Sequence, residues 1–335
     1  MDMRAIAKIA GVSSATVSRV LSGSDLVRPA TAERVRRVVD ECKYVPNGSA
    51  STLKYGRSNS YGLIIPDITN PFFPEFIRSF EGIVVANRQD MLLATSDFQP
   101  SRMQHTIRRM LARKVDGIAL LASEIDTEPI ETLIRNRVPL VTMDRRQVGR
   151  GLSDVSINYS SGMNQAIEHL RQLRHQKIGY IGGLSGLTIS DHRTQAFVKA
   201  VEGVGLKVDP KFIRVGNYRV SGGEAAMAEI LAMKDRPTAI VTANDVTAIG
   251  AIRVIHAAGL SSPNDFSMIG FDDIELSGIV SPPLTTIRLP RHKLAEMFVA
   301  ALESFSKDPH AAGRRYTLKT SLVVRSSTGP APRRN

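Results

Sequence analysis

The sequence contains one cysteine, Cys42, and no tryptophan, and aromatic residues make up 5% of its 335 residues. A single cysteine excludes an intramolecular disulfide and any metal site that needs several thiolates. No apolar run approaches the roughly twenty residues that a membrane-spanning helix requires. The N-terminus also lacks the apolar core of a secretion signal. We therefore expect a protein of the cytoplasm that spans no membrane.

Motifs of common enzyme classes are absent as well. Neither His-Glu-x-x-His nor Gly-x-x-x-x-Gly-Lys-Ser/Thr occurs, and residues 183–187 lack the final glycine of a nucleophile elbow. The seven histidines show no metal-ligand spacing, and His175 and His192 fall in predicted loops, where exposure to solvent is the simplest expectation. The sequence predicts neither catalysis nor a cofactor nor a bound metal.

Acidic residues are outnumbered by basic ones, with 44 Lys and Arg against 32 Asp and Glu and a net charge of +12. Residues 1–57 alone hold ten basic and five acidic side chains. This excess favours a polyanionic partner and association that weakens with salt. It does not by itself identify nucleic acid, because many basic proteins bind none.

Residues 3–22 show the pattern of two short helices that are broken at Gly11, where glycine permits a sharp turn. Ser13 is positioned to cap the second helix. Apolar residues at i, i+3, i+4 spacing predict the buried faces, which are Ile6, Ile9 and Ala10 in the first helix and Val17, Val20 and Leu21 in the second.

A third apolar stripe completes a predicted three-helix head over residues 1–45; it consists of Thr31, Val35, Val38 and Cys42. Periodicity alone is also consistent with a helical hairpin inside a larger core. The outward face of the second helix favours a different interpretation, because it carries small polar residues around one guanidinium, that of Arg19. Small side chains let a helix approach the DNA major groove, and arginine can donate two hydrogen bonds to guanine.

The stretch Ala10-Gly-Val-Ser-x-x-Thr-Val-Ser-Arg-Val-Leu21 resembles the DNA-binding signature of the lactose- and purine-repressor family of bacterial regulators. The resemblance implies that Arg19 reads a base directly, with Ser14 and Ala15 beside it. Hydrogen bonds to phosphate orient such a head without reading sequence. The resemblance and the donor groups assign these phosphate contacts to Ser13, Thr16, Ser18, Ser22, Thr31, Tyr44 and Asn47.

Residues 46–60 are rich in glycine and serine and predict a linker, which the residues alone would describe as a flexible tether. The resemblance implies a hinge helix that forms only on DNA and pairs with its dimer mate. Leu53 then matches an apolar wedge in the minor groove, where such a side chain kinks the duplex, and Lys54 beside it is a further DNA contact.

Strand and helix patterns alternate from Tyr61 onward, which predicts an α/β core with doubly wound parallel sheets. The expected strands are 62–66, 91–95, 117–122, 139–143, 177–181, 212–215, 239–242 and 267–271. The expected helices include 73–85, 163–173, 195–204, 224–233 and 248–257.

The core is also similar to ribose-type periplasmic sugar-binding proteins, and this similarity implies two lobes within residues 61–328. Lobe 1 would span about 61–158 and 288–318, and lobe 2 about 159–287 and 319–328. Three strands would cross between the lobes near residues 158, 287 and 318. The tail 329–335 is rich in proline and arginine, and we expect it to be disordered.

Polar residues follow several of the expected strands, and an aromatic pair lies beside one such cluster. Aromatic rings next to amide and carboxylate groups suit a sugar, whose C–H faces stack while its hydroxyls bond to fixed polar groups. Singly, a strand-end Asp is more often a helix cap, and Phe73 is equally well explained as core. The resemblance implies effector contacts from Asp67, Asn70, Phe72, Phe73, Asp144, Arg145, Arg193, Tyr218, Asn244 and Asp272.

Arg145, Arg193 and Arg288 would give this cleft two or three cations, which Asp144 and Asp272 would offset. We expect a neutral sugar first and a sugar acid or phosphosugar second. Purine-binding members of the family use charged and hydroxyl side chains at two matching places. This chain has Leu187 and Ile189 there, which disfavours a purine.

Together these features predict a homodimeric transcriptional repressor that binds double-stranded operator DNA and is released by a small-molecule effector. Two alternatives remain at this point: a sugar-binding carrier without DNA function, and a regulator that uses its ligand as corepressor. The sequence does not name the effector or the operator, and it does not distinguish a dimer from a tetramer.

Overall fold

The computed structural model describes residues 1–21, 26–44, 58–121 and 127–332. The chain forms two compact units, Met1–Ser58 and Asn59–Asn335. Ser22 and the predicted hinge contacts Asn47, Leu53 and Lys54 lie outside the described residues. Among the helices that are described, none combines the length and apolar character needed to cross a bilayer.

The first unit contains the three predicted helices, α1 (Met3–Ile9), α2 (Ser14–Leu21) and α3 (Pro29–Glu41). Asp2 caps α1 by accepting the Ala5 N–H at 2.9 Å. Ser13 caps α2 by accepting the Thr16 N–H at 3.1 Å. Gly11 between the two helices has a φ of +64°. The break and the second helix's cap are therefore confirmed.

The core of this head differs from the expected stripes at two positions. Ile9 is 55% exposed and Thr31 is only partly buried, whereas Ala7 and Ala32 are buried instead. The buried alanine lies two positions before Ile9 in α1 and one position after Thr31 in α3, so a small side chain fills each helix contact. The buried set is Ile6, Ala7, Ala10, Val17, Val20, Ala32, Val35 and Val38.

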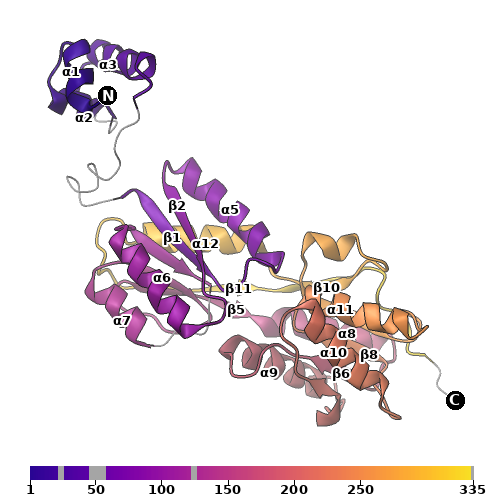
Figure 1. The fold of residues 1–335 in the computed structure, drawn as a ribbon. Coiled ribbons are helices and arrows are strands. Elements are labelled where there is room, and N and C mark those ends of the chain that lie inside the picture. Colours follow the sequence, from indigo (N-terminus) through magenta and orange to yellow (C-terminus); the bar gives the residue numbers. More distant parts are fainter. Residues whose placement is uncertain (22–25, 45–57, 122–126, 333–335) are drawn as a thin grey trace. The chain divides into compact units, whose positions relative to one another are not determined.

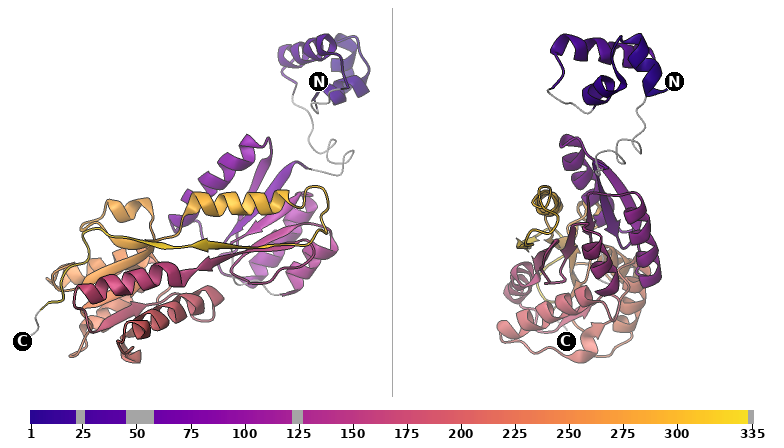
Figure 2. Two further views of the ribbon diagram at one scale, coloured as in Figure 1. Left: turned by 180° about the vertical axis from the view of Figure 1, so that it is seen from behind. Right: turned by 90° about the vertical axis from the view of Figure 1, so that its left-hand side faces the viewer.

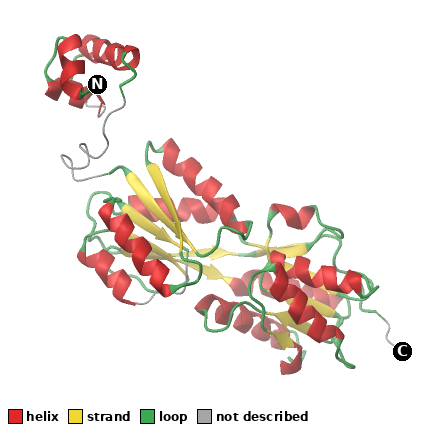
Figure 3. Ribbon diagram, viewed as in Figure 1, coloured by secondary structure: helices red, strands yellow, loops and turns green. Residues whose placement is uncertain are grey.

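The second unit has two lobes, each built on a six-stranded sheet with helices on both faces (Figures 1 and 3). In the first lobe all pairings are parallel and the spatial order is β11-β5-β4-β3-β1-β2. Its strands are β1 (Ser60–Ile65), β2 (Asp90–Thr95), β3 (Gly117–Leu120), β4 (Leu140–Met143), β5 (Leu152–Asn158) and β11 (Arg315–Lys319). Its helices are α5 (Phe72–Ala86), α6 (Pro100–Ala112), α7 (Thr127–Arg135) and α12 (Arg291–Glu303).

The second lobe repeats this plan in the order β12-β10-β9-β8-β6-β7, with only β12 antiparallel to its neighbour among the pairs described. Its strands are β6 (Ile178–Ile181), β7 (Ile213–Arg214), β8 (Ala239–Thr242), β9 (Ser267–Asp272), β10 (Thr285–Arg288) and β12 (Ser321–Val323). Its helices are α8 (Tyr159–Gln172), α9 (Thr188–Gly203), α10 (Val220–Leu231), α11 (Asp245–Ala257) and the short η1 (Pro210–Phe212) and η2 (Glu275–Gly278). The expected strands are all present, and each end lies within two residues of its predicted place.

The chain crosses between the lobes three times. It passes from β5 to α8 at 158–159, from β10 to α12 at 288–291, and from β11 to β12 at 319–321. Figure 2 shows the C-terminal strands running along both lobes. These three segments are the connections that hold the two lobes together.

Two expectations about polar segments are wrong. His175 is fully buried and bonds to Thr238, Ser267 and the carbonyl of Gly329, while His192 lies in α9 rather than in a loop. The Ala331 N–H donates to the carbonyl of Leu173 at 2.8 Å. Residues 329–332 are thus fixed against the second lobe, and the prediction of a disordered tail fails for them.

Helices α10 and α11 pack at very close range because two glycines face the opposite backbone. A Cβ atom added to Gly223 would overlap the carbonyl oxygen of Thr247, and one added to Gly250 would overlap that of Val220. Even a methyl group therefore forces the helices apart, although both glycines lie in ordinary helical conformation.

We predict that Gly223→Ala lowers the free energy of unfolding by about 1–3 kcal/mol, because the extra methyl overpacks a rigid backbone contact. Chemical denaturation of the full chain measures the effect. Gly203→Ala, near the end of α9, is the matched control, since a Cβ there meets no atom within 4 Å. The control should raise stability by about 0.4–1 kcal/mol. Equal stability of the two variants would contradict the packing argument.

Candidate DNA-reading helix and ligand pocket

The exposed face of α2 carries Ala15 and Arg19, which are four residues apart and therefore adjacent on the helix surface. Val17 and Val20 are buried on the opposite side and anchor α2 in the head. Ser14, Thr16 and Ser18 are partly buried along the edges of the exposed face. The helix thus presents the side chains that were assigned to base contact, with the smallest of them next to the guanidinium.

The predicted phosphate contacts surround this helix in several structural roles. The hydroxyls of Ser13 and Thr16 lie 2.9 Å apart, so both take part in the N-terminal cap of α2. Thr31 lies in the first turn of α3, and Tyr44 packs against the head's apolar core. Capping and packing fix these side chains in position, and hydroxyl groups retain further capacity for hydrogen bonds.

A narrow pocket lies between the lobes of the second unit, at the carboxyl ends of strands from both sheets. Its cavity volume is about 50 Å³. Seven of the ten predicted effector contacts line it: Asp67, Asn70, Phe72, Phe73, Arg193, Tyr218 and Asp272. Ligands of open parallel sheets bind at this edge, so the fold explains why residues so distant in sequence converge here.

Arg193 is the central cation of this pocket and is 5% exposed. Its guanidinium donates to the carbonyl of Ala243 and lies 3.4 Å from Asp272. The guanidinium carbon is 4.1 Å from the centre of the Phe271 ring, and 5.4 Å and 5.9 Å from those of Tyr159 and Tyr218. Three aromatic rings therefore supply cation–π contacts where water is excluded.

Asp272 is fully buried beside this cation. Burial raises the Asp272 pKa from its ordinary value of 3.8 to about 6, although Arg193 and Arg291 both oppose the rise. Desolvation therefore outweighs the charge pairing. The carboxyl group changes charge close to physiological pH, in direct contact with the guanidinium.

Asp67 lies at the mouth of the pocket and ties the lobes together. One carboxylate oxygen accepts from the Thr69 N–H at 2.8 Å, and the other accepts from Arg219 of the second lobe at 3.0 Å. Burial would raise the Asp67 pKa, but the bonds from Thr69 and Arg219 outweigh it and lower the pKa. Asn70 shapes the same loop by accepting the Phe72 N–H at 3.0 Å.

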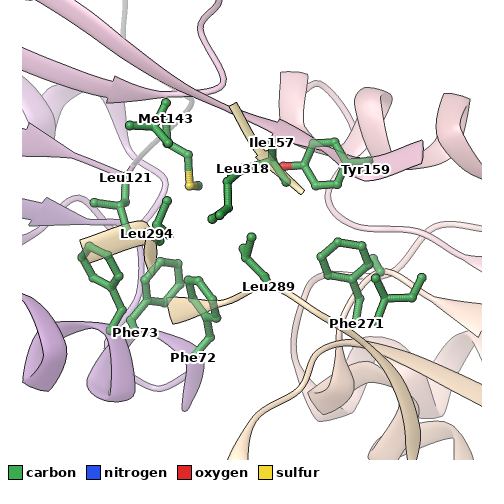
Figure 4. Close-up of a cluster of buried hydrophobic side chains, with 14 of the residues drawn as sticks. Phe72, Phe73, Leu121, Met143, Ile157, Tyr159, Phe271, Leu289, Leu294 and Leu318 are labelled. Carbon is green, nitrogen blue, oxygen red and sulfur yellow. The ribbon is translucent and has the colours of Figure 1, made fainter. Parts of the chain in front are cut away.

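Apolar side chains form the remaining wall. Phe72 and Phe73 meet edge to face, with ring centres 5.3 Å apart. Figure 4 shows this pair on one side, Tyr159 and Phe271 on the other, and Leu289 between them. Both phenylalanines belong to the core cluster and also line the pocket, so Phe73 packs in the core and faces the cavity at the same time.

Three predicted contacts do not line the pocket. Asn244 caps α11 by accepting the Thr247 N–H at 3.0 Å, and it donates to the Tyr218 carbonyl at 3.0 Å. Asp144 has a φ of +61°, which turns its carboxylate away from the pocket to the Ile157 N–H at 2.7 Å and the Tyr159 hydroxyl. Burial raises the Asp144 pKa.

Arg145, the third of these residues, follows Asp144 in the same turn, and its N–H donates to Asp154 at 3.0 Å. Asn244 therefore fixes the backbone of Tyr218, whose ring lines the pocket. Asp144 holds the hydroxyl of Tyr159, whose ring contacts Arg193 from outside the pocket.

The sequence analysis did not identify several residues that line the pocket. Most of them are apolar residues at the ends of strands or in loops, where they look like ordinary core residues. Arg219, the partner of Asp67, gave no signal except its place after Tyr218. Met143 ends its strand directly beside the recognised Asp144, and Leu121 directly follows β3; these strand-end places are the one clue that could have identified them. The additional lining residues are Pro66, Phe98, Leu121, Met143, Ile189 and Leu289.

A helix-turn-helix head together with a two-lobed core that holds a pocket at its strand ends defines a ligand-responsive DNA-binding regulator. Comparison with known protein families supports the same class of protein. The family of "Bacterial regulatory proteins, lacI family" matches residues 2–47, and the "Periplasmic binding protein-like domain" matches residues 167–328. The chain belongs to the lacI family of transcriptional regulators.

Curated relatives match almost the whole chain. The transcriptional repressor PurR of Photobacterium profundum is 32% identical over 96% of this chain and 97% of its own length. The transcriptional repressor CytR of Escherichia coli is 32% identical over 98% and 97%.

Solved structures agree in fold as well. The lac repressor dimer bound to operator and the anti-inducer ONPF has a TM-score of 0.86 at 25% identity, covering 98% of this chain and 99% of that one. A lacI-family regulator of Enterococcus faecium with bound ribose has a TM-score of 0.72 at 27% identity, covering 81% and 99%.

We predict that Asp272 makes the protein less stable as the pH rises. Its folded-state pKa lies above the unfolded value, so its stabilising contribution is complete below about pH 4 and is lost as the pH rises through 6. A shift from 3.8 to about 6 corresponds to about 3 kcal/mol. Relative to Asp272→Asn, the unaltered protein should lose that amount between pH 4 and pH 7 in denaturant titrations.

The exposed Asp90 provides the control for this measurement. Asp90→Asn should follow the pH profile of the unaltered protein. A profile of Asp272→Asn that is parallel to the unaltered one would show that Asp272 titrates normally.

Proposed function

We propose that this protein is a transcriptional repressor whose second unit binds a neutral sugar and thereby releases the head from operator DNA. The observation that carries the proposal is the pocket between the lobes, in which Arg193, Asp67 and Asp272 surround an aromatic wall. Ring faces suit the C–H surface of a sugar, and fixed charged groups suit its hydroxyls.

The charges of the pocket favour a neutral sugar over a sugar acid or phosphosugar. Of the three cations expected in the cleft, only Arg193 lines it. Arg288 instead pairs with Asp273 at 2.6 Å, outside the pocket. Two carboxylates, Asp67 and Asp272, accompany the single guanidinium, so an anionic ligand would meet no excess of positive charge.

The size of the cavity supports a coupling between binding and lobe movement. Its volume of about 50 Å³ is far below the 300–1,000 Å³ of ordinary ligand pockets. A sugar can enter only if the lobes separate or the side chains around Arg193 move. The Asp67–Arg219 ion pair spans the mouth and would have to yield first. A ligand thus favours a lobe spacing wider than the one that leaves this small cavity, which is the differential binding that allostery requires.

The dimeric state, the DNA partner and the kind of effector are inferred from the class of protein. The lac repressor structure, a dimer on its operator, supports a homodimer that places two α2 helices on adjacent half-sites of double-stranded DNA. The bound ribose of the Enterococcus faecium regulator supports a sugar-like effector. We infer a cytoplasmic protein that binds its ligand without transforming it.

We predict that Arg19→Ala removes sequence discrimination while salt-sensitive, non-specific binding persists. The loss should be about 1–3 kcal/mol of preference for a selected operator over a scrambled duplex. Fluorescence anisotropy with both duplexes measures it, after the operator has been selected from random sequences. Arg36→Ala, an exposed arginine of α3, serves as the control and should keep the preference. An equal loss of affinity on every sequence would contradict the role assigned to Arg19.

We predict saturable binding of ribose or another neutral sugar, and weaker binding of the matching aldonic acid. Asn70→Ala should reduce the sugar affinity about tenfold, which corresponds to one lost hydrogen bond. Asn264→Ala, on the surface away from the pocket, should leave it unchanged. Calorimetric titration gives both affinities. Binding of acids alone would overturn the choice of a neutral ligand, and tighter operator binding with sugar would reverse the sign of regulation.

A further inference from the structure

A second cavity lies between the lobes, on the other side of α9 from the sugar pocket. Its volume is about 370 Å³, within the range of small-molecule sites. The first lobe contributes Arg146, part of β5 and the β11 residues Arg315 and Thr317. The second lobe contributes the start of α8 and the α9 residues His192, Gln195, Ala196 and Lys199.

The cavity is strongly basic. Arg146, Lys199 and Arg315 all line it, whereas no Asp or Glu is among its lining residues. Within the described parts of the chain, no carboxylate forms an ion pair with any of these three cations. Burial and the neighbouring Arg146 lower the pKa of His192 more than Asp144 and Asp191 raise it, so its imidazole is mostly neutral at pH 7. Three positive charges therefore gather in one cavity whose described lining residues include no acid.

We propose that this cavity is a second ligand site, for a small molecule that carries a phosphate group. The guanidinium groups of Arg146 and Arg315 can each donate two parallel hydrogen bonds to phosphate oxygens. Lys199 adds a point charge from the opposite lobe. Ser160 and Thr317 line the cavity with hydroxyl groups that can donate to the same oxygens or to the rest of the molecule.

The position of the site links it to the sugar pocket. Helix α9 presents Ile189 and Arg193 to the sugar pocket, and it presents His192 and Lys199 to the basic cavity. Tyr159 lines the basic cavity while its ring lies 5.4 Å from the guanidinium carbon of Arg193. An anion that joins Arg146 and Arg315 to Lys199 draws the two lobes together along this edge.

The anion therefore changes the sugar affinity, because it favours one lobe spacing. This coupling rests on the proposed sugar-binding function, whereas binding of the anion does not.

The test is calorimetric titration of the full-length protein with inorganic phosphate and, separately, with glycerol 3-phosphate at constant ionic strength. We expect saturable binding of both, with glycerol 3-phosphate the tighter because the cavity exceeds the volume of a phosphate ion. Arg146→Gln and Lys199→Gln should each weaken binding at least tenfold, and the double variant should remove it. Lys234→Gln, an exposed lysine of the second lobe, removes the same charge elsewhere and should have no effect.

Saturable binding that survives in the double variant, or none beyond that of matched chloride in the unaltered protein, overturns the proposal. Binding of inorganic phosphate alone supports the site and identifies free phosphate as its ligand. The sugar proposal is judged independently by the effect of Asn70→Ala on ribose binding. Failure of one titration therefore leaves the other intact. A change of the ribose affinity with glycerol 3-phosphate, absent in the double variant, measures the coupling.

Discussion

The buried guanidinium of Arg193 is the constraint on which the arrangement of the second unit depends. A cation removed from water is costly unless charged, polar and aromatic partners surround it. Here these partners come from the second lobe and from the first crossing: Asp272 from β9, Tyr218 from the loop before α10, and Tyr159 at the start of α8. The hydroxyl of Tyr159 donates to Asp144 of the first lobe. Arg193 is thus linked to the first lobe through Tyr159, which makes it a natural point at which ligand and lobe spacing meet.

The distribution of the other cations explains how one core can treat neutral and charged ligands differently. Arg288 and Arg325 both bind the carboxylate of Asp273, and Arg291 binds Glu75 and nearby carbonyls. Carboxylates thus pair with Arg288, Arg325 and Arg291, so these arginines add no unpaired positive charge to the pocket. Arg146, Lys199 and Arg315 have no such carboxylate partner among the described residues. The aromatic pocket therefore has no excess of positive charge, whereas these three cations line the basic cavity across α9.

Sequence patterns identified the fold and most of the pocket because both depend on features that are local in the chain. Apolar runs locate strands, and parallel strands bring their ends to one edge, so Asp67, Asn70 and Asp272 could be placed together. The direction in which each side chain points was not predictable from the sequence. Asp144 follows its strand like the others, but a left-handed backbone conformation turns its carboxylate to Tyr159. Arg219 could not be found, since its partner Asp67 lies 152 residues earlier. The predicted core of the head is wrong only at Ile9 and Thr31, where the nearby Ala7 and Ala32 are buried instead.

The C-terminal segment has a consequence for the order in which the protein can form. Strand β11 completes the sheet of the first lobe, β12 completes that of the second, and residues 329–331 cover His175. The three helices of the head, by contrast, lie within residues 3–41. During synthesis the reading head can thus fold as soon as it leaves the ribosome, whereas both lobes wait for the last twenty or so residues. A nascent chain would already possess its DNA-facing helix while the part that senses the metabolite is still unfinished.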